Sequence, residues 1–113
     1  CQNAHLESMK GLDGNQIVSL SAVAHGVRAY YAYPMSPSSQ ILMHLSNWAP
    51  KTGMIVKQTE DEISVVQMAI GSMYAGTRAL CATSGGGFDL MVESVSLAGM
   101  IETPLVVIDV QRP

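Results

Sequence analysis

The chain has 113 residues, 48% of them hydrophobic, and a formal net charge of −3. This length can enclose one hydrophobic core but hardly two independent domains. The six Lys and Arg residues are spread singly and form no basic stripe, which argues against a nucleic-acid partner. No apolar run approaches the ~20 residues of a membrane span, and the N-terminal segment lacks the features of a secretory signal. We therefore expect a cytoplasmic protein without a membrane partner.

The first half of the chain alternates predicted helix and strand. Residues 14–26 carry apolar side chains at helical spacing and close on a glycine. Residues 29–33 form a short β-prone run before a proline. A second helix is expected from a cap at Ser36, with Pro37 in its first turn, to about residue 50. The predicted buried faces are Ile17, Leu20, Ala24 and Val27 in the first helix, and Ile41, Leu45 and Trp48 in the second.

The second half repeats the alternation. We expect strands at residues 54–57, 79–83 and 104–110, a third helix between residues 59 and 76, and a fourth at residues 88–100. Because parallel strands need crossover connections, this order predicts the α/β class, a parallel sheet with helices on both faces. The predicted buried face of the third helix comprises Ile63, Val66, Ile70 and Met73.

The predicted organisation is one domain over residues 14–113, preceded by a linker or tail at residues 1–13. The sequence ends directly after a predicted strand, so we expect the domain to be truncated and to continue beyond Pro113. In open α/β sheets, ligands gather beyond the carboxyl ends of the strands. Four segments are expected to converge there: residues 33–39, 58–62, 83–88 and 111–113.

Cysteine and histidine give no sign of a metal site in this chain. Cys1 and Cys81 have neither the spacing of a disulfide framework nor that of zinc ligands, and Cys81 is interpreted as a buried thiol. His25 and His44 are interpreted as structural helix residues without a metal partner. The low charge content (13%) and eight methionines favour a surface that contacts a partner.

Two of the converging segments allow both a structural and a functional interpretation. The glycines at 85–87 precede a helix N-terminus and can cradle a phosphate, but a tight turn explains them equally, because the dinucleotide and P-loop patterns are incomplete. Glu62 completes a Thr59-x-x-Glu62 capping box, which the local pattern alone favours over a catalytic role. Arg112 can bind a carboxylate through its planar fork or be a solvated end residue.

Taken together, YPMSPSS, TEDEI, ATSGGGF and TPLVVIDVQRP resemble motifs of the pyrimidine-binding (PYR) domain in alpha subunits of 2-oxoacid:ferredoxin (2-oxoacid:acceptor) oxidoreductases. The resemblance runs from Gly14 to Pro113 and implies a thiamine diphosphate-binding PYR-type fold. It also implies oxidative decarboxylation of a 2-oxoacid to an acyl-CoA, with coenzyme A and ferredoxin as partners. The cofactor would be shared with a diphosphate-binding domain, usually in the beta subunit, which binds Mg2+. Iron–sulfur clusters would lie only in partner subunits or domains.

The resemblance also implies roles for individual residues. Glu62 corresponds to the glutamate that hydrogen-bonds the pyrimidine ring nitrogen and so promotes loss of the thiazolium proton. Ser36, where the family usually has Thr, and Arg112 would bind the 2-oxoacid. The glycines that would pack beside the pyrimidine and the partner domain are Gly85, Gly86 and Gly87.

Two alternatives remain open at the level of the sequence. One is the PYR domain of another thiamine diphosphate enzyme, such as a decarboxylase or a transketolase-like protein, against which YPMSPSS and QRP argue. The other is a non-catalytic fragment that only builds a subunit interface. The orientation of Glu62 separates catalysis from the second alternative, because a catalytic side chain faces an open rim and a capping one folds back on Thr59.

Overall fold

An all-parallel sheet of four strands forms the centre of the structure, a computed structural model that describes residues 13–111. The strand order is β2-β1-β3-β4, so the two inner strands are β1 and β3. Every residue of these two strands is buried, as expected for strands covered on both faces. The predicted α/β class is therefore confirmed. The strands are β1 (Ala29–Ala32), β2 (Ile55–Gln58), β3 (Ala79–Thr83) and β4 (Val107–Asp109).

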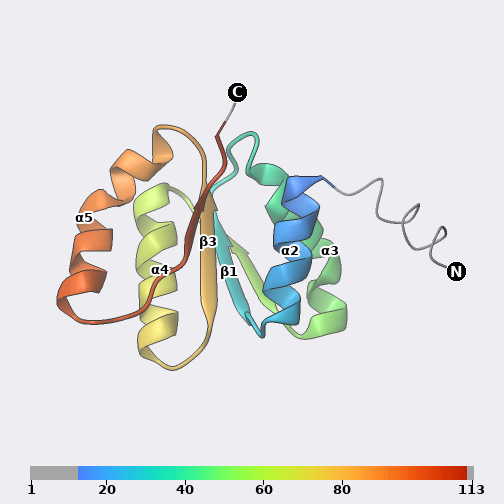
Figure 1. Ribbon diagram of the computed structural model, residues 1–113, viewed down its shortest axis with the longest axis horizontal. Coiled ribbons are helices and arrows are strands. Elements are labelled where there is room, and N and C mark those ends of the chain that lie inside the picture. Colours follow the sequence, from blue (N-terminus) through green and yellow to red (C-terminus); the bar gives the residue numbers. More distant parts are fainter. Residues whose placement is uncertain (1–12, 112–113) are drawn as a thin grey trace, which may run out of the picture.

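Two helices cover each face of the sheet (Figure 1). The chain runs from β1 outward to β2 and then back past β1 to β3. Because parallel crossovers keep one hand, the helices of these two connections must lie on opposite faces. Helices α2 (Gly14–Ala24) and α3 (Ser39–Thr52) pack on one face, and α4 (Glu62–Tyr74) and α5 (Gly87–Met100) pack on the other.

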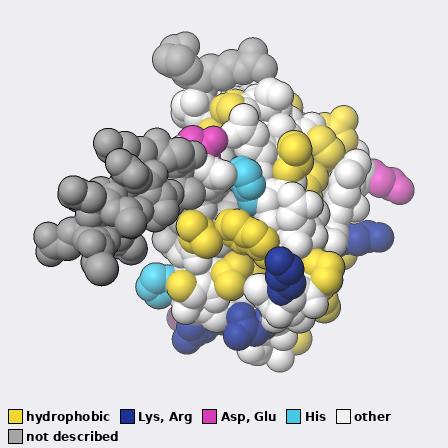
Figure 2. All heavy atoms as spheres, turned by 90° about the vertical axis from the view of Figure 1, so that its right-hand side faces the viewer, with side chains coloured by type: hydrophobic (Ala, Val, Ile, Leu, Met, Phe, Trp, Pro, Cys, Tyr) yellow, Lys and Arg dark blue, Asp and Glu magenta, His cyan; other side chains and the backbone are white. Residues whose placement is uncertain are grey.

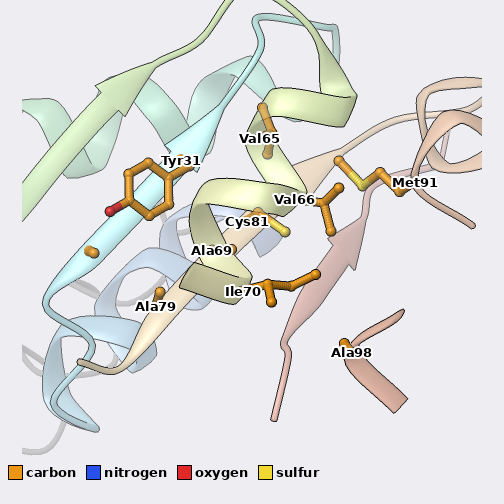
Figure 3. Close-up of a cluster of buried hydrophobic side chains, with 10 residues drawn as sticks. Tyr31, Val65, Val66, Ala69, Ile70, Ala79, Cys81, Met91 and Ala98 are labelled. Atoms are coloured by element: carbon orange, nitrogen blue, oxygen red, sulfur yellow. The ribbon is translucent and has the colours of Figure 1, made fainter. Parts of the chain in front are cut away.

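Side chains of the inner strands alternate between the two core clusters. Tyr31 and Cys81 belong to the cluster under α4 and α5, whereas Tyr30 and Leu80 belong to the cluster under α2 and α3. Figure 3 shows the first cluster, where α4 lies across the sheet and its small or branched side chains contact the strands. This alternation fixes which face each later residue of a strand meets. The α4 residues in this cluster are Val65, Val66, Ala69 and Ile70.

The predicted buried face of the first helix is wrong. Ile17 and Leu20 remain 51% and 43% exposed, whereas Ser19 and Ala22 are buried. Small residues let α2 approach the sheet closely, and the hydroxyl of Ser19 is satisfied inside the helix by donating to the Asn15 carbonyl at 2.8 Å. Large hydrophobic side chains alone therefore indicated the wrong stripe. Ile63 of α4, also predicted to be buried, is 48% exposed.

The predicted start of the second helix is also wrong. The helix begins at Ser39 rather than after a cap at Ser36. The hydroxyl of Ser38 donates to the carbonyl of Met35 at 2.7 Å, and the Ser39 amide donates to the same carbonyl at 3.0 Å. These bonds close a turn over residues 36–38, which delays the helix.

The end and the buried face of α3 can be compared with the prediction as well. The helix continues through Pro50 to Thr52 and ends at Gly53, whose φ of 71° is left-handed. Ile41 and Leu45, predicted on the buried face, are fully buried.

The outer surface carries several large apolar side chains. On the face made by α2 and α3, seen in Figure 2, Ile17, Leu20 and Met43 are all more than 40% exposed. The prediction that part of this surface contacts a partner stays a prediction. Among the described helices, none combines the length and the apolar character needed to cross a bilayer.

Candidate functional site

The carboxyl ends of β1 and β3 define the place where a ligand is expected. These strands are neighbours in the sheet, yet the helices that follow them, α3 and α5, lie on opposite faces. A crevice at such a switch point is the usual ligand site of an open parallel sheet. The loops after β1 and β3 leave the sheet at the same edge, the upper edge in Figure 1. This edge is called the rim below.

Glu62 is the first residue of α4, but it does not cap the helix. The N-cap is Asp61, whose carboxylate accepts a hydrogen bond from the Ser64 amide at 2.7 Å. Hydrogen bonds from Ser64 hold the pKa of Asp61 below its usual value. The predicted capping box between Thr59 and Glu62 is therefore wrong.

The physical reason lies in the bonds that Thr59 makes. Its amide donates to the carbonyl of Ala32 at 3.0 Å, so it continues the pairing of β2 with β1. Its hydroxyl donates to the carbonyl of Asp61 at 3.1 Å. With Thr59 still bound to the sheet, the helix begins later, and the next residue able to cap it is Asp61.

The Glu62 side chain is buried beside the start of α5. It is 6% exposed, and its carboxylate accepts no hydrogen bond from any other residue between 13 and 111. A Cβ built on Gly87 would lie 3.0 Å from Glu62 Cγ and 3.2 Å from Glu62 Oε1. The carboxyl group thus occupies space that only a glycine at position 87 leaves open.

The three glycines expected at the site have different surroundings. Gly85 has a φ of 53°, in the left-handed region, and forms the tight turn with Gly86. A Cβ on either of these two would meet nothing within 4 Å. Gly87 is buried and is the one of the three that touches Glu62. The turn interpretation of this segment is confirmed.

The two residues expected to bind substrate are placed differently. Ser36 lies in the exposed turn that follows β1, at the rim. It makes no hydrogen bond to Glu62 within the part of the chain that the structure describes. Arg112 lies outside the described residues.

Thr83 is a rim residue that the sequence analysis missed. It is the last residue of β3, it is 1% exposed, and its hydroxyl has no hydrogen-bond partner among the described residues. A Cβ on Gly87 would lie 2.2 Å from this hydroxyl oxygen. The signal was available in the strand alternation, because Thr83 shares the parity of Cys81 and so faces α4 and α5.

The remaining titratable residues do not extend the site. Cys81 is a fully buried thiol, as predicted, and burial raises its pKa to about 12. His25 bonds the carbonyl of Ser21 through Nδ1 at 2.8 Å, and the His44 ring stacks on Trp48. Between residues 13 and 111, no group of three or more His, Cys, Asp or Glu side chains is arranged to hold a metal ion.

A parallel sheet with a buried carboxyl at its switch point defines the class of α/β cofactor-binding domains. The family described as "Pyruvate flavodoxin/ferredoxin oxidoreductase, thiamine diP-bdg" matches residues 21–113, and the chain belongs to this family. The predicted family is thereby confirmed, and thiamine diphosphate is the cofactor that the family description names.

Similar proteins come from archaea and bacteria. The 2-oxoglutarate synthase subunit KorA of Methanocaldococcus jannaschii is 42% identical over 101 residues, which cover 89% of this chain and 28% of that protein. The ketoisovalerate oxidoreductase subunit VorB of Methanothermobacter thermautotrophicus is 36% identical over 99 residues, covering 88% of this chain and 28% of that protein.

A solved structure shares the fold. It is a 2-oxoglutarate:ferredoxin oxidoreductase from Magnetococcus marinus with 2-oxoglutarate, coenzyme A and succinyl-CoA bound. The TM-score is 0.87 at 39% identity, over 89% of this chain and 18% of that one. The chain therefore spans less than a third of the length of these relatives.

Proposed function

We propose that this chain is the pyrimidine-binding half of the thiamine diphosphate site in the alpha subunit of a 2-oxoacid:ferredoxin oxidoreductase, with Glu62 as its catalytic carboxyl. The observation that carries the proposal is the state of Glu62. Its carboxyl is buried at the rim, while the neighbouring Asp61 performs the capping that would otherwise explain an acid at this position.

The other rim residues support the binding of a planar heterocycle. Gly87 leaves space beside the Glu62 carboxyl that a Cβ would fill. Thr83 contributes a buried hydroxyl without a partner at the same point. A buried polar group without a partner is costly in a folded protein, so such groups are concentrated at sites that bind ligands.

The chemistry of the site follows from the carboxyl group. When bound, thiamine diphosphate supplies the nucleophile that attacks the 2-oxoacid carbonyl and the acceptor for the electrons left by carbon dioxide. Glu62 would hydrogen-bond the pyrimidine ring nitrogen and share a proton with it. An apolar surrounding of Val65 and Met91, both fully buried nearby in the core, limits competition from water.

The whole enzyme would need groups from outside this chain. A diphosphate-binding domain in a beta subunit would hold the phosphates and Mg2+, and partner subunits or domains would hold iron–sulfur clusters that pass electrons to ferredoxin. Coenzyme A would accept the acyl group. The relatives are named for 2-oxoglutarate and for ketoisovalerate, so the supported substrate class is a 2-oxoacid rather than one particular acid.

Two residues are proposed to bind the 2-oxoacid. Ser36 is supported by its place in an exposed turn directly after β1, at the rim. Its hydroxyl can donate a hydrogen bond to the substrate carboxylate or carbonyl. The proposal for Arg112 rests on the sequence motif, in which its planar fork would pair with the substrate carboxylate.

The test compares two glutamates of one acidic segment in the full-length enzyme with its partner subunit. Glu62→Gln is nearly isosteric but cannot share a proton with the ring nitrogen. We expect hydrogen–deuterium exchange at the thiazolium C2 to slow by roughly 10²- to 10⁴-fold, the usual contribution of a positioned acid or base. Glu60→Gln is the control, because Glu60 is exposed and two residues away. Unchanged exchange in Glu62→Gln, or an equal loss in both variants, contradicts the proposal and favours a fragment that only builds an interface.

A further inference from the structure

Thr83 carries a hydroxyl that the fold buries but does not satisfy. The residue is 1% exposed, and Oγ1 has no hydrogen-bond partner among the described residues. Val would fill the same volume in a central strand without a polar atom. The presence of Thr therefore points to a partner for the hydroxyl.

The surroundings of Gly87 indicate which group that partner is. A Cβ on Gly87 would lie 2.2 Å from Thr83 Oγ1 and 3.2 Å from Glu62 Oε1, so both oxygens border one point. Thr83 faces α4 and α5, the side from which Glu62 approaches. A hydroxyl can donate one hydrogen bond, and an ionised carboxylate can only accept.

We propose that Thr83 is a positioning residue for Glu62, which donates its hydroxyl hydrogen to one carboxylate oxygen in the space that Gly87 leaves open. A charge-assisted bond of this kind is stronger than a bond between neutral groups. It fixes the terminal torsion of Glu62, which is otherwise broad, and leaves the second oxygen for the ligand. The inference rests on the proposed role of Glu62 at the cofactor.

The first test measures the contact without cofactor, in the full-length protein with its partner subunit. Thr83→Val removes the hydroxyl and keeps the shape, and Glu62→Met removes the acceptor. We expect Thr83→Val to lower the thermal unfolding midpoint when Glu62 is present and to leave it unchanged or higher in the Glu62→Met background, because an unpaired buried hydroxyl gives no stability. Additive midpoint shifts in this cycle overturn the proposal.

The second test asks whether the contact serves the site. Thr83→Val should slow thiazolium C2 exchange about tenfold, the loss expected for a hydrogen bond to a charged group, and Thr83→Ser should restore it. The pair Thr83→Ser and Thr83→Ala differs only in the hydroxyl and provides the same comparison if the Val variant does not assemble. Equal exchange in the two members of a pair overturns the proposal.

Further outcomes separate this inference from the proposed function. If Thr83 and Glu62 couple only after thiamine diphosphate is added, the hydroxyl contacts the ligand directly and the positioning role is wrong. If they couple without cofactor but Glu62→Gln leaves C2 exchange unchanged, the contact stands and the proposed function fails. Coupling together with slow exchange in both Glu62→Gln and Thr83→Val supports both.

Discussion

Replacing Gly87 by Ala would test the packing of the rim directly. The new Cβ would lie 2.2 Å from Thr83 Oγ1 and 3.0 Å from Glu62 Cγ, far inside the ~3.5 to 4.0 Å of an ordinary contact between heavy atoms. Thr83 cannot move away easily, because it is β-branched and its strand pairs with β1 and β4. The start of α5 and the Glu62 side chain must therefore shift.

The size of the effect follows from two opposing terms. Overpacking of this kind costs about 1 to 3 kcal/mol. The loss of glycine freedom in the unfolded chain returns about 0.4 to 1 kcal/mol. We expect Gly87→Ala to lower the free energy of unfolding by about 1 to 2 kcal/mol and to weaken thiamine diphosphate binding, because Glu62 is displaced.

The two preceding glycines supply matched controls. Gly86 has a φ of −65° and open space around its Cβ position, so Gly86→Ala should be neutral within about 0.5 kcal/mol. Gly85→Ala meets no atom but must adopt a φ of 53°, which costs about 1 to 2 kcal/mol. Only Gly87→Ala should also reduce cofactor affinity.

Urea unfolding and calorimetric titration of the full-length protein distinguish the three variants. If Gly87→Ala matches Gly86→Ala in both stability and cofactor affinity, Thr83 and Glu62 do not occupy the space beside Gly87 in solution. The reasoning about the rim would then be refuted at its geometric basis.

Two further predictions concern neighbouring positions. The pKa of Asp61 is lowered in the folded state, so its contribution to stability is complete above the ordinary value of 3.8 and is lost as the pH falls through the lowered folded value. Asp61→Asn keeps a capping side chain without the titration, so its urea midpoint should fall less than that of the parent between about pH 5 and pH 2, and equal slopes would contradict this. Ser36→Ala should lower kcat/KM for the 2-oxoacid about fivefold, the equivalent of one hydrogen bond of ~1 kcal/mol, while leaving thiamine diphosphate affinity and the melting temperature unchanged, because the side chain is exposed. A parental kcat/KM would place the substrate elsewhere.

Much of the fold could be predicted because strand and helix periods are local properties. The inner strands were found closely, since residues 79–83 form a continuous apolar run of the kind that parallel sheets bury. Helix faces were harder. Ser19 is buried and Ile17 is exposed, because the sheet demands a close approach and a serine can bond within its own helix. Hydropathy ranks side chains by transfer energy and contains neither requirement.

Helix starts were the other weak point, because they depend on bonds to distant residues. The amide of Thr59 is used by Ala32, far away in sequence, and this contact displaces the cap to Asp61. No local pattern contains that information. The roles of the site residues came from the joint occurrence of four motifs, whereas the buried hydroxyl of Thr83 required the register of β3 against α4 and α5.

The acidic segment before α4 shows why sequence alone could not separate its members. Glu60, Asp61 and Glu62 are adjacent acids in one turn, and each type is acceptable near a helix N-terminus. The fold gives them different environments, because Glu60 is exposed, Asp61 bonds the Ser64 amide and Glu62 is buried against Gly87. An acid at the cap position frees the next acid from that duty. A buried carboxyl can then be kept for a ligand without loss of the helix start, which is the arrangement that catalysis by Glu62 requires.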